Sequence, residues 1–198
     1  MKILFQGAHG AYSHLAALEV YPGAEIIPCK TFDECFSRAI KDEKLKIIIP
    51  ESNKTTGNIG IEYLIFKYRL NIYEEHFHRI EHNLLGIPGA KIKDIKNVLS
   101  HAQGLSQCSD YIKKNDLIEN VRADTAGSAE SVSKNKEISD AAIASKLSAK
   151  IYKLDVIASN IENEKGNTTR FLIMGKPIYQ PELEKKKIYY FFFVQAKK

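Results

Sequence analysis

Two hydroxyls and a guanidinium stand directly in front of a short apolar segment, in the sequence GNTTRFLIMG at residues 166–175. The apolar residues 171–174 predict a short buried strand. A strand that only builds a core does not need Thr168, Thr169 and Arg170 in a row at its start. A hydroxyl can hydrogen-bond a reacting oxygen, and a guanidinium can pair bidentately with a carboxylate. These residues therefore indicate an anionic ligand, or a chemical step, at this edge.

Small polar residues also follow other predicted strands. Short apolar runs alternate along the chain with helix-like segments, which is typical of parallel sheets with helices on their faces. Ligands of such sheets bind beyond the carboxyl ends of the strands, where helices begin. The residues at these points are Ser13, Ser52, Asn53, Ser100, His101, Thr125 and Ser145. Each can be a plain helix cap, or together they can form a rim that suits a carboxylate or phosphate.

Composition and charge exclude several classes of protein. The chain has 198 residues, of which 44% are hydrophobic and 27% charged, as in ordinary globular proteins. No apolar run approaches the roughly 18 residues of a membrane span. The net charge of +5 comes from lysines scattered among acids, whereas a nucleic-acid interface gathers its basic residues on one face. We therefore expect neither a membrane nor a nucleic acid as partner, but an anionic small molecule.

Familiar cofactor and nucleophile motifs are missing from the sequence, which has no Gly-rich dinucleotide loop, no Walker loop and no Gly-x-Ser-x-Gly elbow. His76 and His78 would share one strand face, with His82 nearby, but no acid or cysteine cluster completes a metal site. We therefore predict no metal and no cofactor. Three cysteines cannot all pair and the first residues do not read as a signal peptide, so we expect reduced thiols and a cytoplasmic protein.

Six segments occur in an order typical of one enzyme family. They are GAHGAYSHLAA, IIPESNKTTGNIG, LSHAQGLSQC, DTAGSAE, AAIAS and NTTRFLIMG, and they cover residues 3–175. This ordered set resembles the prephenate dehydratases, whose hallmark is an Asn-x-Thr-Arg-Phe strand. The chain departs from the family pattern around Asn53, where Ser52 and Lys54 replace the usual Glu and Ser. Lys54 either supplies the carboxylate contact that Ser makes in the family or points to solvent.

The resemblance implies a fold. It is α/β, with two lobes of the type II periplasmic-binding-protein-like kind and the active site in the cleft between them. One lobe is expected to hold residues 1–76 with 159–178, and the other residues 77–158. Residues 179–198 resemble the beginning of the regulatory ACT domain of this family. We therefore expect either a truncated longer protein or a tail packed on its own domain or on a partner subunit. We also expect a homodimer, and no inhibition by phenylalanine.

The resemblance also implies a reaction, the loss of CO2 and a hydroxyl from prephenate to give phenylpyruvate, a lyase step of phenylalanine biosynthesis that needs no cofactor. Thr169 is expected to hydrogen-bond the departing oxygen, because a free threonine hydroxyl is a poor acid at neutral pH. Arg170 either pairs with a substrate carboxylate or forms a structural salt bridge, and Phe171 either contacts the substrate or fills the core. The expected substrate-binding residues are Ser13, Asn53, Ser100, Gln107, Arg170 and Phe171. Ser100 and Gln107 would share a helix face if a helix began at Ser100.

Two alternatives to this activity stay open. The preferred substrate could be arogenate, the aminated analogue of prephenate. The chain could also be a non-catalytic sensor of an aromatic amino acid or keto acid, because one fold can carry different functions. The complete Asn-Thr-Thr-Arg-Phe run at residues 167–171 favours the enzyme, since a sensor does not need the hydroxyl.

Overall fold

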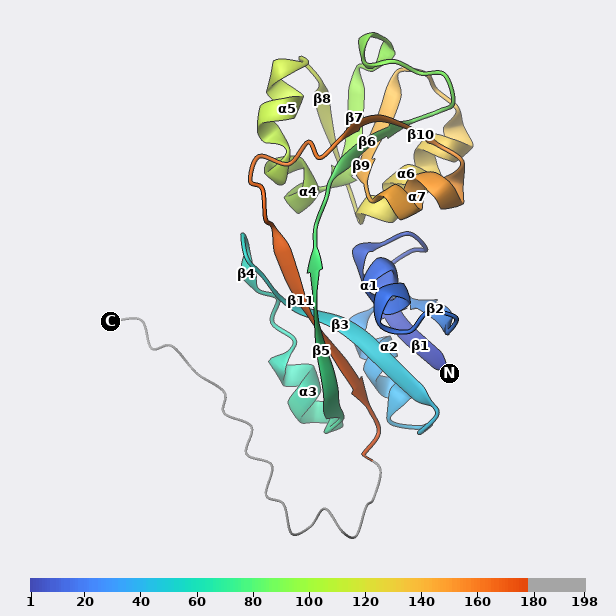
Figure 1. The fold of residues 1–198 in the computed structure, drawn as a ribbon, viewed down its shortest axis with the longest axis vertical. Coiled ribbons are helices and arrows are strands. Elements are labelled where there is room, and N and C mark those ends of the chain that lie inside the picture. Colours follow the sequence, from blue (N-terminus) through green and yellow to red (C-terminus); the bar gives the residue numbers. More distant parts are fainter. Residues whose placement is uncertain (178–198) are drawn as a thin grey trace, which may run out of the picture.

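The computed structural model describes residues 1–177 of the protein. This part of the chain forms two sheets, which lie one above the other in Figure 1 and carry helices on their faces. The predicted α/β fold class is confirmed. Residues 179–198, in which we expect the beginning of a regulatory domain, lie outside the described residues, so that expectation stays a prediction.

The first sheet combines strands from both ends of the chain (Figure 1). Its order is β2-β1-β3-β11-β5, and β4 pairs with the end of β3. The strands are β1 Lys2–Gln6, β2 Glu25–Cys29, β3 Leu45–Asn53, β4 Gly57–Asn58, β5 Asn71–Arg79 and β11 Thr168–Gly175. Strand β1 is parallel to β2 and β3, but β11 is antiparallel to β3 and β5. The predicted parallel pairing is thus found for β1, β2 and β3, whereas the segments that carry the chain out of this sheet, β5, and back into it, β11, add antiparallel pairs that the prediction did not include.

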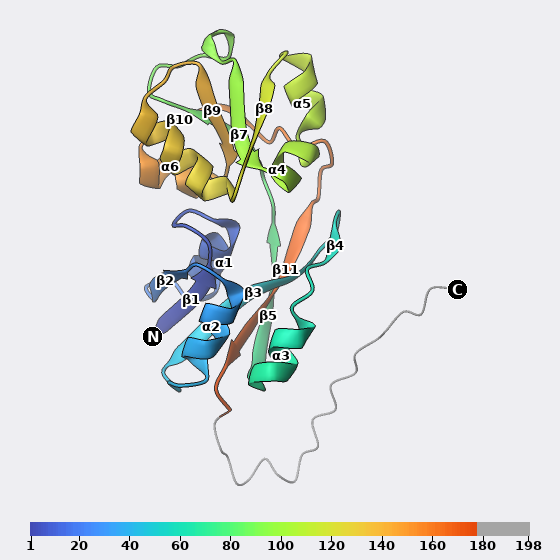
Figure 2. The same cartoon turned by 180° about the vertical axis from the view of Figure 1, so that it is seen from behind.

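Helices cover both faces of the first sheet (Figure 2). They are α1 Tyr12–Val20, α2 Phe32–Ala39 and α3 Glu62–Tyr68. On one face, Ala16 of α1 belongs to a buried apolar cluster with Phe5 and Phe171. On the other face, Phe36 of α2 belongs to a cluster against which Leu64 of α3 packs. The sheet is thus the middle layer of three, and its inner strands β1, β3 and β11 are apolar on both sides.

The second sheet has the order β10-β6-β9-β7-β8. Strand β7 is parallel to β8 and β9, and β6 is antiparallel to β9 and β10. Its strands are β6 Asn83–Gly86, β7 Asn97–His101, β8 Ile118–Arg122, β9 Asp140–Ala144 and β10 Asp155–Ser159, and its helices are the 3-10 helix η1 Ile92–Asp94, α4 Ala102–Gln107, α5 Ser109–Lys114, α6 Thr125–Asn135 and α7 Lys146–Tyr152. Within residues 1–177, no helix combines the length and the apolar character that crossing a membrane requires.

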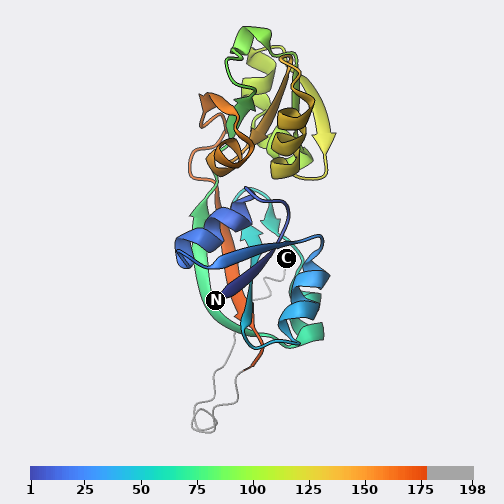
Figure 3. The same ribbon diagram turned by 90° about the vertical axis from the view of Figure 1, so that its right-hand side faces the viewer.

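The chain crosses between the two sheets twice, and the two crossing segments are hydrogen-bonded to each other (Figure 3). The backbone N–H of Ile80 donates to the Asn167 carbonyl at 2.8 Å, and that of Ile161 donates to the His82 carbonyl at 3.0 Å. Outgoing and returning segments therefore form one narrow connection. The ends of β3 and β11 lie beside it, which places them next to the second sheet.

The predicted lobe boundaries fall inside strands. Strand β5 continues beyond residue 76 to Arg79, whose Cα partner in β11 is Thr168. Strand β10 runs to Ser159, and it still pairs with β6 of the second sheet at that residue. Sequence patterns could not show at which residues the chain crosses between the sheets. The lengths of β5 and β10 depend on where their pairing partners end, and those partners are distant in the sequence. The assignment of the chain to two lobes stays a prediction.

Candidate active site

The centre of the candidate site is a hydrogen bond between the ends of β3 and β11. Asn53 and Thr169 are Cα partners across the ladder, although they are 116 positions apart in the sequence. The Asn53 Nδ2 amide donates to Thr169 Oγ1 at 2.8 Å and to Asn167 Oδ1 at 2.7 Å. Asn53 is 8% exposed and Thr169 is 6% exposed. Thr169 Oγ1 thus accepts a hydrogen bond, and no acceptor for its own proton is found among the described residues.

The turn after β3 fixes the orientation of the Asn53 amide. The Asn53 Oδ1 accepts from the backbone N–H of Thr55 at 2.9 Å and of Thr56 at 3.3 Å. A backbone N–H can only donate, so Oδ1 must face the turn and Nδ2 must face Thr169. The hydroxyl of Thr169 therefore meets a donor, and its own proton is available to an oxygen of a bound ligand.

Gln107, at the end of α4, connects this turn with the second sheet. Its Nε2 donates to Thr55 Oγ1 at 2.7 Å, and its Oε1 lies 2.8 Å from His82 Nε2. His82 Nδ1 lies 2.9 Å from the Tyr12 hydroxyl of α1. Thr55 Oγ1 also donates to Asn53 Oδ1 at 2.6 Å. A continuous chain of hydrogen bonds thus runs from the amide that holds the catalytic candidate to helix α1.

The protonation of His82 follows from its partners. His82 is 2% exposed, and burial lowers the pKa of His82, which favours the neutral ring. Gln107 Oε1 can only accept, so Nε2 of the neutral ring carries the proton and Nδ1 is an acceptor. The Tyr12 hydroxyl lies 2.9 Å from both Nδ1 and the Glu81 carbonyl, so these two acceptors compete for its single proton. Sequence reasoning treated His82 as a neighbour of a possible metal site and missed this link, because its partners lie 25 and 70 positions away.

A cavity of about 190 Å³ lies beside this network. Its lining residues are Thr55, Thr56, Ser106, Gln107, Glu162, Asn163, Glu164 and Asn167. Asn167 shares the amide donor of Asn53 with Thr169, so the hydroxyl and the cavity wall are joined through one side chain. A larger hollow of about 510 Å³ lies near His9 and Tyr152. None of the polar residues of the network lines it, so we place the chemistry at the smaller cavity.

Ser100 and Ser13 lie apart from this network. The Ser100 hydroxyl donates to the Ile143 carbonyl at 2.8 Å and is fully buried within the second sheet. Ser100 belongs to β7, and α4 begins at Ala102. The condition under which Ser100 and Gln107 would share a helix face is therefore not met, because Ser100 and His101 precede the helix. Ser13 is buried in the first turn of α1, next to His14, whose Nδ1 accepts from the backbone N–H of Gly10 at 3.0 Å.

Arg170 and Phe171 both have partners within the first sheet and the core beside it. Arg170 lies 2.8 Å from Glu75 of β5 and 3.3 Å from Glu51 of β3, so it forms ion pairs with both neighbouring strands. Successive strand residues point to opposite faces, and Arg170 thus lies on the face opposite to Thr169. Phe171 is 1% exposed and packs in the core with Phe5. The geometry favours the salt-bridge and core alternatives for these two residues.

A second contact joins the two sheets at the loop after β1. The Gly10 carbonyl accepts from the Ser145 hydroxyl at 2.6 Å and from the Ser148 hydroxyl at 3.0 Å. A Cβ on Gly10 would lie 2.5 Å from Ser148 Oγ, and its φ of +95° is one that L side chains rarely adopt. Ser145 also caps α7, since its hydroxyl accepts from the Ser148 N–H at 3.1 Å. Ser145 therefore both caps α7 and contacts the loop after β1 of the first sheet.

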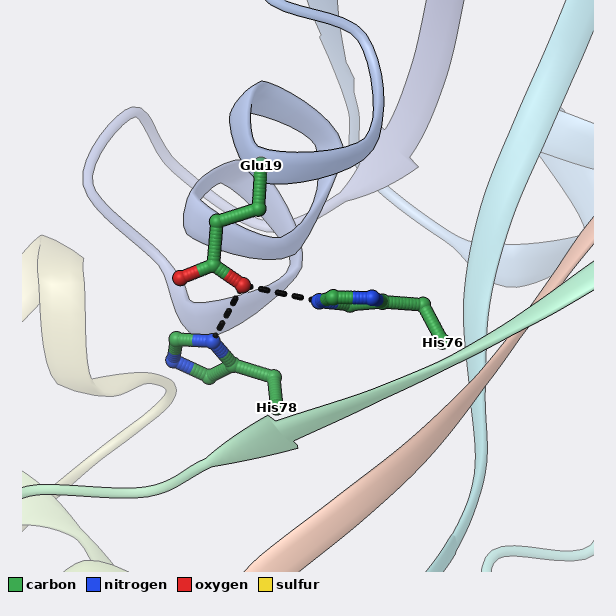
Figure 4. Close-up of side chains that lie close together, drawn as sticks. All are labelled: Glu19, His76 and His78. Carbon is green, nitrogen blue, oxygen red and sulfur yellow. Dashed lines mark hydrogen bonds and ion pairs between the residues drawn. The ribbon is translucent and has the colours of Figure 1, made fainter.

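The histidine pair of β5 has an acidic partner that sequence reasoning missed (Figure 4). Glu19 Oε2, from α1, lies 2.7 Å from His76 Nε2 and 2.9 Å from His78 Nδ1. Burial alone would raise the pKa of Glu19, but the hydrogen bonds from His78 and His76 outweigh it and hold that pKa below its ordinary value. The statement that no acid completes this cluster is therefore wrong. Glu19 precedes His76 by 57 positions, and only the packing of α1 on β5 brings them together.

Comparisons with known proteins agree on one family. The family model described as prephenate dehydratase matches residues 3–178. A relative from Arabidopsis thaliana, "Arogenate dehydratase/prephenate dehydratase 1, chloroplastic", is 39% identical over 186 residues, covering 93% of this chain and 47% of the relative. The chain thus spans about half the length of that curated relative.

Solved structures share the fold. A structure titled "GqqA- a novel type of quorum quenching acylases" has a TM-score of 0.83 and 34% identity, and the match covers 91% of this chain and 66% of the other. The prephenate dehydratase from Staphylococcus aureus subsp. aureus Mu50 has a TM-score of 0.73 and 26% identity, covering 88% and 67%. Because the family model matches residues 3–178, most of the chain, the chain belongs to the prephenate dehydratase family.

Proposed function

We propose that the protein is a lyase that converts prephenate to phenylpyruvate, CO2 and water in phenylalanine biosynthesis. In this reaction the carbon–carbon bond to the ring carboxylate breaks, and its electron pair moves into the ring as the carbon–oxygen bond of the hydroxyl breaks. The departing hydroxide needs a proton. The observation that carries the proposal is the buried Thr169 hydroxyl, which accepts from Asn53 and has no acceptor for its own proton within residues 1–177.

In the proposed mechanism Thr169 donates a hydrogen bond to the departing oxygen. Negative charge develops on that oxygen as its bond to carbon breaks, so the contact is stronger in the transition state than in the ground state, and such contacts accelerate a reaction. The Asn53 amide polarises the hydroxyl by donating to Oγ1, which makes it a better donor. A water or a neighbouring group then replenishes any proton that is transferred.

We propose a supporting role for the polar wall of the cavity. Asn53 positions the turn and the Thr169 hydroxyl, and Gln107 lines the cavity, where a substrate can reach its amide. Ser13 stays a proposed substrate contact. For Ser100, Arg170 and Phe171 we propose structural roles instead, because their polar or apolar groups are already engaged with Ile143, with Glu51 and Glu75, and with the core.

Arogenate is the second candidate substrate, because the names of several relatives include arogenate dehydratase. The assay that tests the proposal offers prephenate and arogenate separately to purified protein and measures phenylpyruvate and phenylalanine. We expect turnover of prephenate, with an unchanged rate after treatment with a chelator. A protein that binds aromatic acids but turns over neither substrate would be a sensor, and the proposal would be wrong.

We further propose a homodimer, which light scattering on the purified protein would test. The cytoplasmic location also stays a proposal, and the names of several relatives contain the word chloroplastic. Fractionation of cells that express the native gene would decide it.

A further inference from the structure

Two histidines and one carboxylate meet on the face of the first sheet that α1 covers (Figure 4). The Glu19 carboxylate oxygen lies 2.7 Å from His76 Nε2 and 2.9 Å from His78 Nδ1. The three possible ligand atoms all lie within 4.8 Å of one another. The exposed fractions of the side chains are 45% for Glu19, 26% for His76 and 11% for His78. The cluster is thus preformed, and an ion can reach it from solvent.

The fold fixes these three side chains independently of one another. His76 and His78 are two apart on β5, so strand alternation directs both to the same face. Their Cα partners in β11 are Phe171 and Thr169, which point to the same side of the sheet. Helix α1 packs over that side, as the contact of its alanines with Phe171 shows. The carboxylate of Glu19 then reaches the histidines from the edge of the helix.

We propose that Glu19, His76 and His78 bind a divalent transition-metal ion, with Zn²⁺ the best fit and water in the remaining position. Two imidazoles and one carboxylate are a ligand set that zinc uses in proteins, with bonds of about 2.0–2.2 Å and tetrahedral geometry. Ligand atoms of such a site lie about 3.3 Å apart. The observed separations of 2.7 and 2.9 Å between Glu19 and the histidines require shifts of less than about 1 Å to admit the ion.

The site lies outside the proposed reaction and has a different role. A metal ion there ties α1 to β5 through bonds from both elements. The same helix carries Tyr12, whose ring centroid is 6.2 Å from that of His78 and whose hydroxyl contacts His82. Metal binding therefore stabilises the first lobe and the helix at the beginning of the hydrogen-bond chain, without touching the cavity at Gln107.

The test measures metal binding directly. Protein without a polyhistidine tag is treated with a chelator, dialysed, and titrated with ZnCl2 by calorimetry, and CoCl2 gives an independent optical signal for a tetrahedral site. We expect one ion per chain, and a Tm that rises by roughly 5 °C when zinc is 100-fold above its Kd. Absence of stoichiometric binding, or an octahedral Co²⁺ spectrum with no change in Tm, would mean that Glu19 only accepts hydrogen bonds.

Variants separate this site from adventitious binding. Glu19→Gln keeps the size of the side chain and removes a charged ligand, and we expect it to weaken zinc binding at least about 10-fold. His78→Ala should do the same, and it keeps the test decisive if the first variant folds poorly. Glu130→Gln is the matched control, because Glu130 pairs with Lys134 in its own helix, α6. Equal zinc affinity in Glu19→Gln, His78→Ala and Glu130→Gln would overturn the proposal. Binding is read without activity, so an inactive protein would contradict the proposed function but not the metal site.

Discussion

Thr169 and Arg170 lie on opposite faces of β11, and their side chains differ in burial and in hydrogen-bond partners. On one face Thr169 is buried, accepts a hydrogen bond from Asn53 and has no described acceptor for its own proton. On the other face Arg170 is 40% exposed and pairs with Glu51 and Glu75 of the adjacent strands. A side chain whose hydrogen-bond donors are already paired with protein acceptors has few left for a ligand. A buried donor without a protein acceptor can still donate to a ligand. The comparison therefore supports our proposal that the reaction takes place on the face of Thr169 and that Arg170 has a structural role.

The largest expected effect is that of Thr169→Val, which keeps the shape of the side chain and removes the hydroxyl. We expect kcat to fall by roughly 100-fold or more with a smaller change in KM, because the lost contact acts in the transition state. Steady-state kinetics with prephenate measure it. Thr168→Val is the matched control, since Thr168 points to the other face and donates to the Gly166 carbonyl at 3.2 Å. Similar kcat values for the two variants would show that the faces do not differ as we infer.

Asn53→Ala tests whether Thr169 acts alone or depends on its donor. The variant leaves the hydroxyl in place but frees its rotation, so we expect kcat to fall roughly 10-fold or more. Removal of the buried amide also leaves Asn167 Oδ1 and the turn without a partner, which should cost about 1–3 kcal/mol of unfolding free energy. Kinetics and thermal unfolding measured on the same preparation separate the two effects. Full activity in a destabilised protein would limit Asn53 to a structural role.

A pH effect on stability is expected from His82, which belongs to the chain of hydrogen bonds that begins at Asn53. Burial lowers the pKa of His82 in the folded state, so the unfolded chain binds a proton at a higher pH than the folded one. The stability linked to His82 is therefore complete above the ordinary histidine pKa of about 6.5 and is lost as pH falls below it, at no more than about 1.4 kcal/mol per pH unit. Urea unfolding between pH 8 and pH 5 measures this loss. His82→Gln should flatten the curve, and an unchanged slope would contradict the neutral ring.

The smallest expected effect belongs to Arg170→Lys. The substitution keeps the charge but loses the planar fork that reaches both Glu51 and Glu75. Because the pairs are partly exposed, we expect a loss of no more than about 1 kcal/mol of unfolding free energy. KM for prephenate should stay within about twofold of the native value, since the loss of an engaged surface contact changes binding little. A rise in KM of tenfold with normal stability would instead place a substrate carboxylate at Arg170.

The sequence by itself determined the α/β class and the family, because both depend on local patterns and on the order of six motifs. It also identified Thr169 and Asn53 as residues of interest. Strand alternation predicts that Thr169 and Arg170 point to opposite faces of β11. The sequence could not show which of the two faces a ligand would reach, because the neighbouring side chains on each face come from strands β3 and β5.

Only the tertiary structure decided which partners these residues have. Asn53 and Thr169 are 116 positions apart, and Glu19 and His76 are 57 positions apart, so no local pattern links either pair. The antiparallel return of β11 between β3 and β5 brings the first pair together, and the packing of α1 on β5 brings the second. The physical reason is that side-chain chemistry is set by distances of about 3 Å, which depend on strand pairing and helix packing between distant segments.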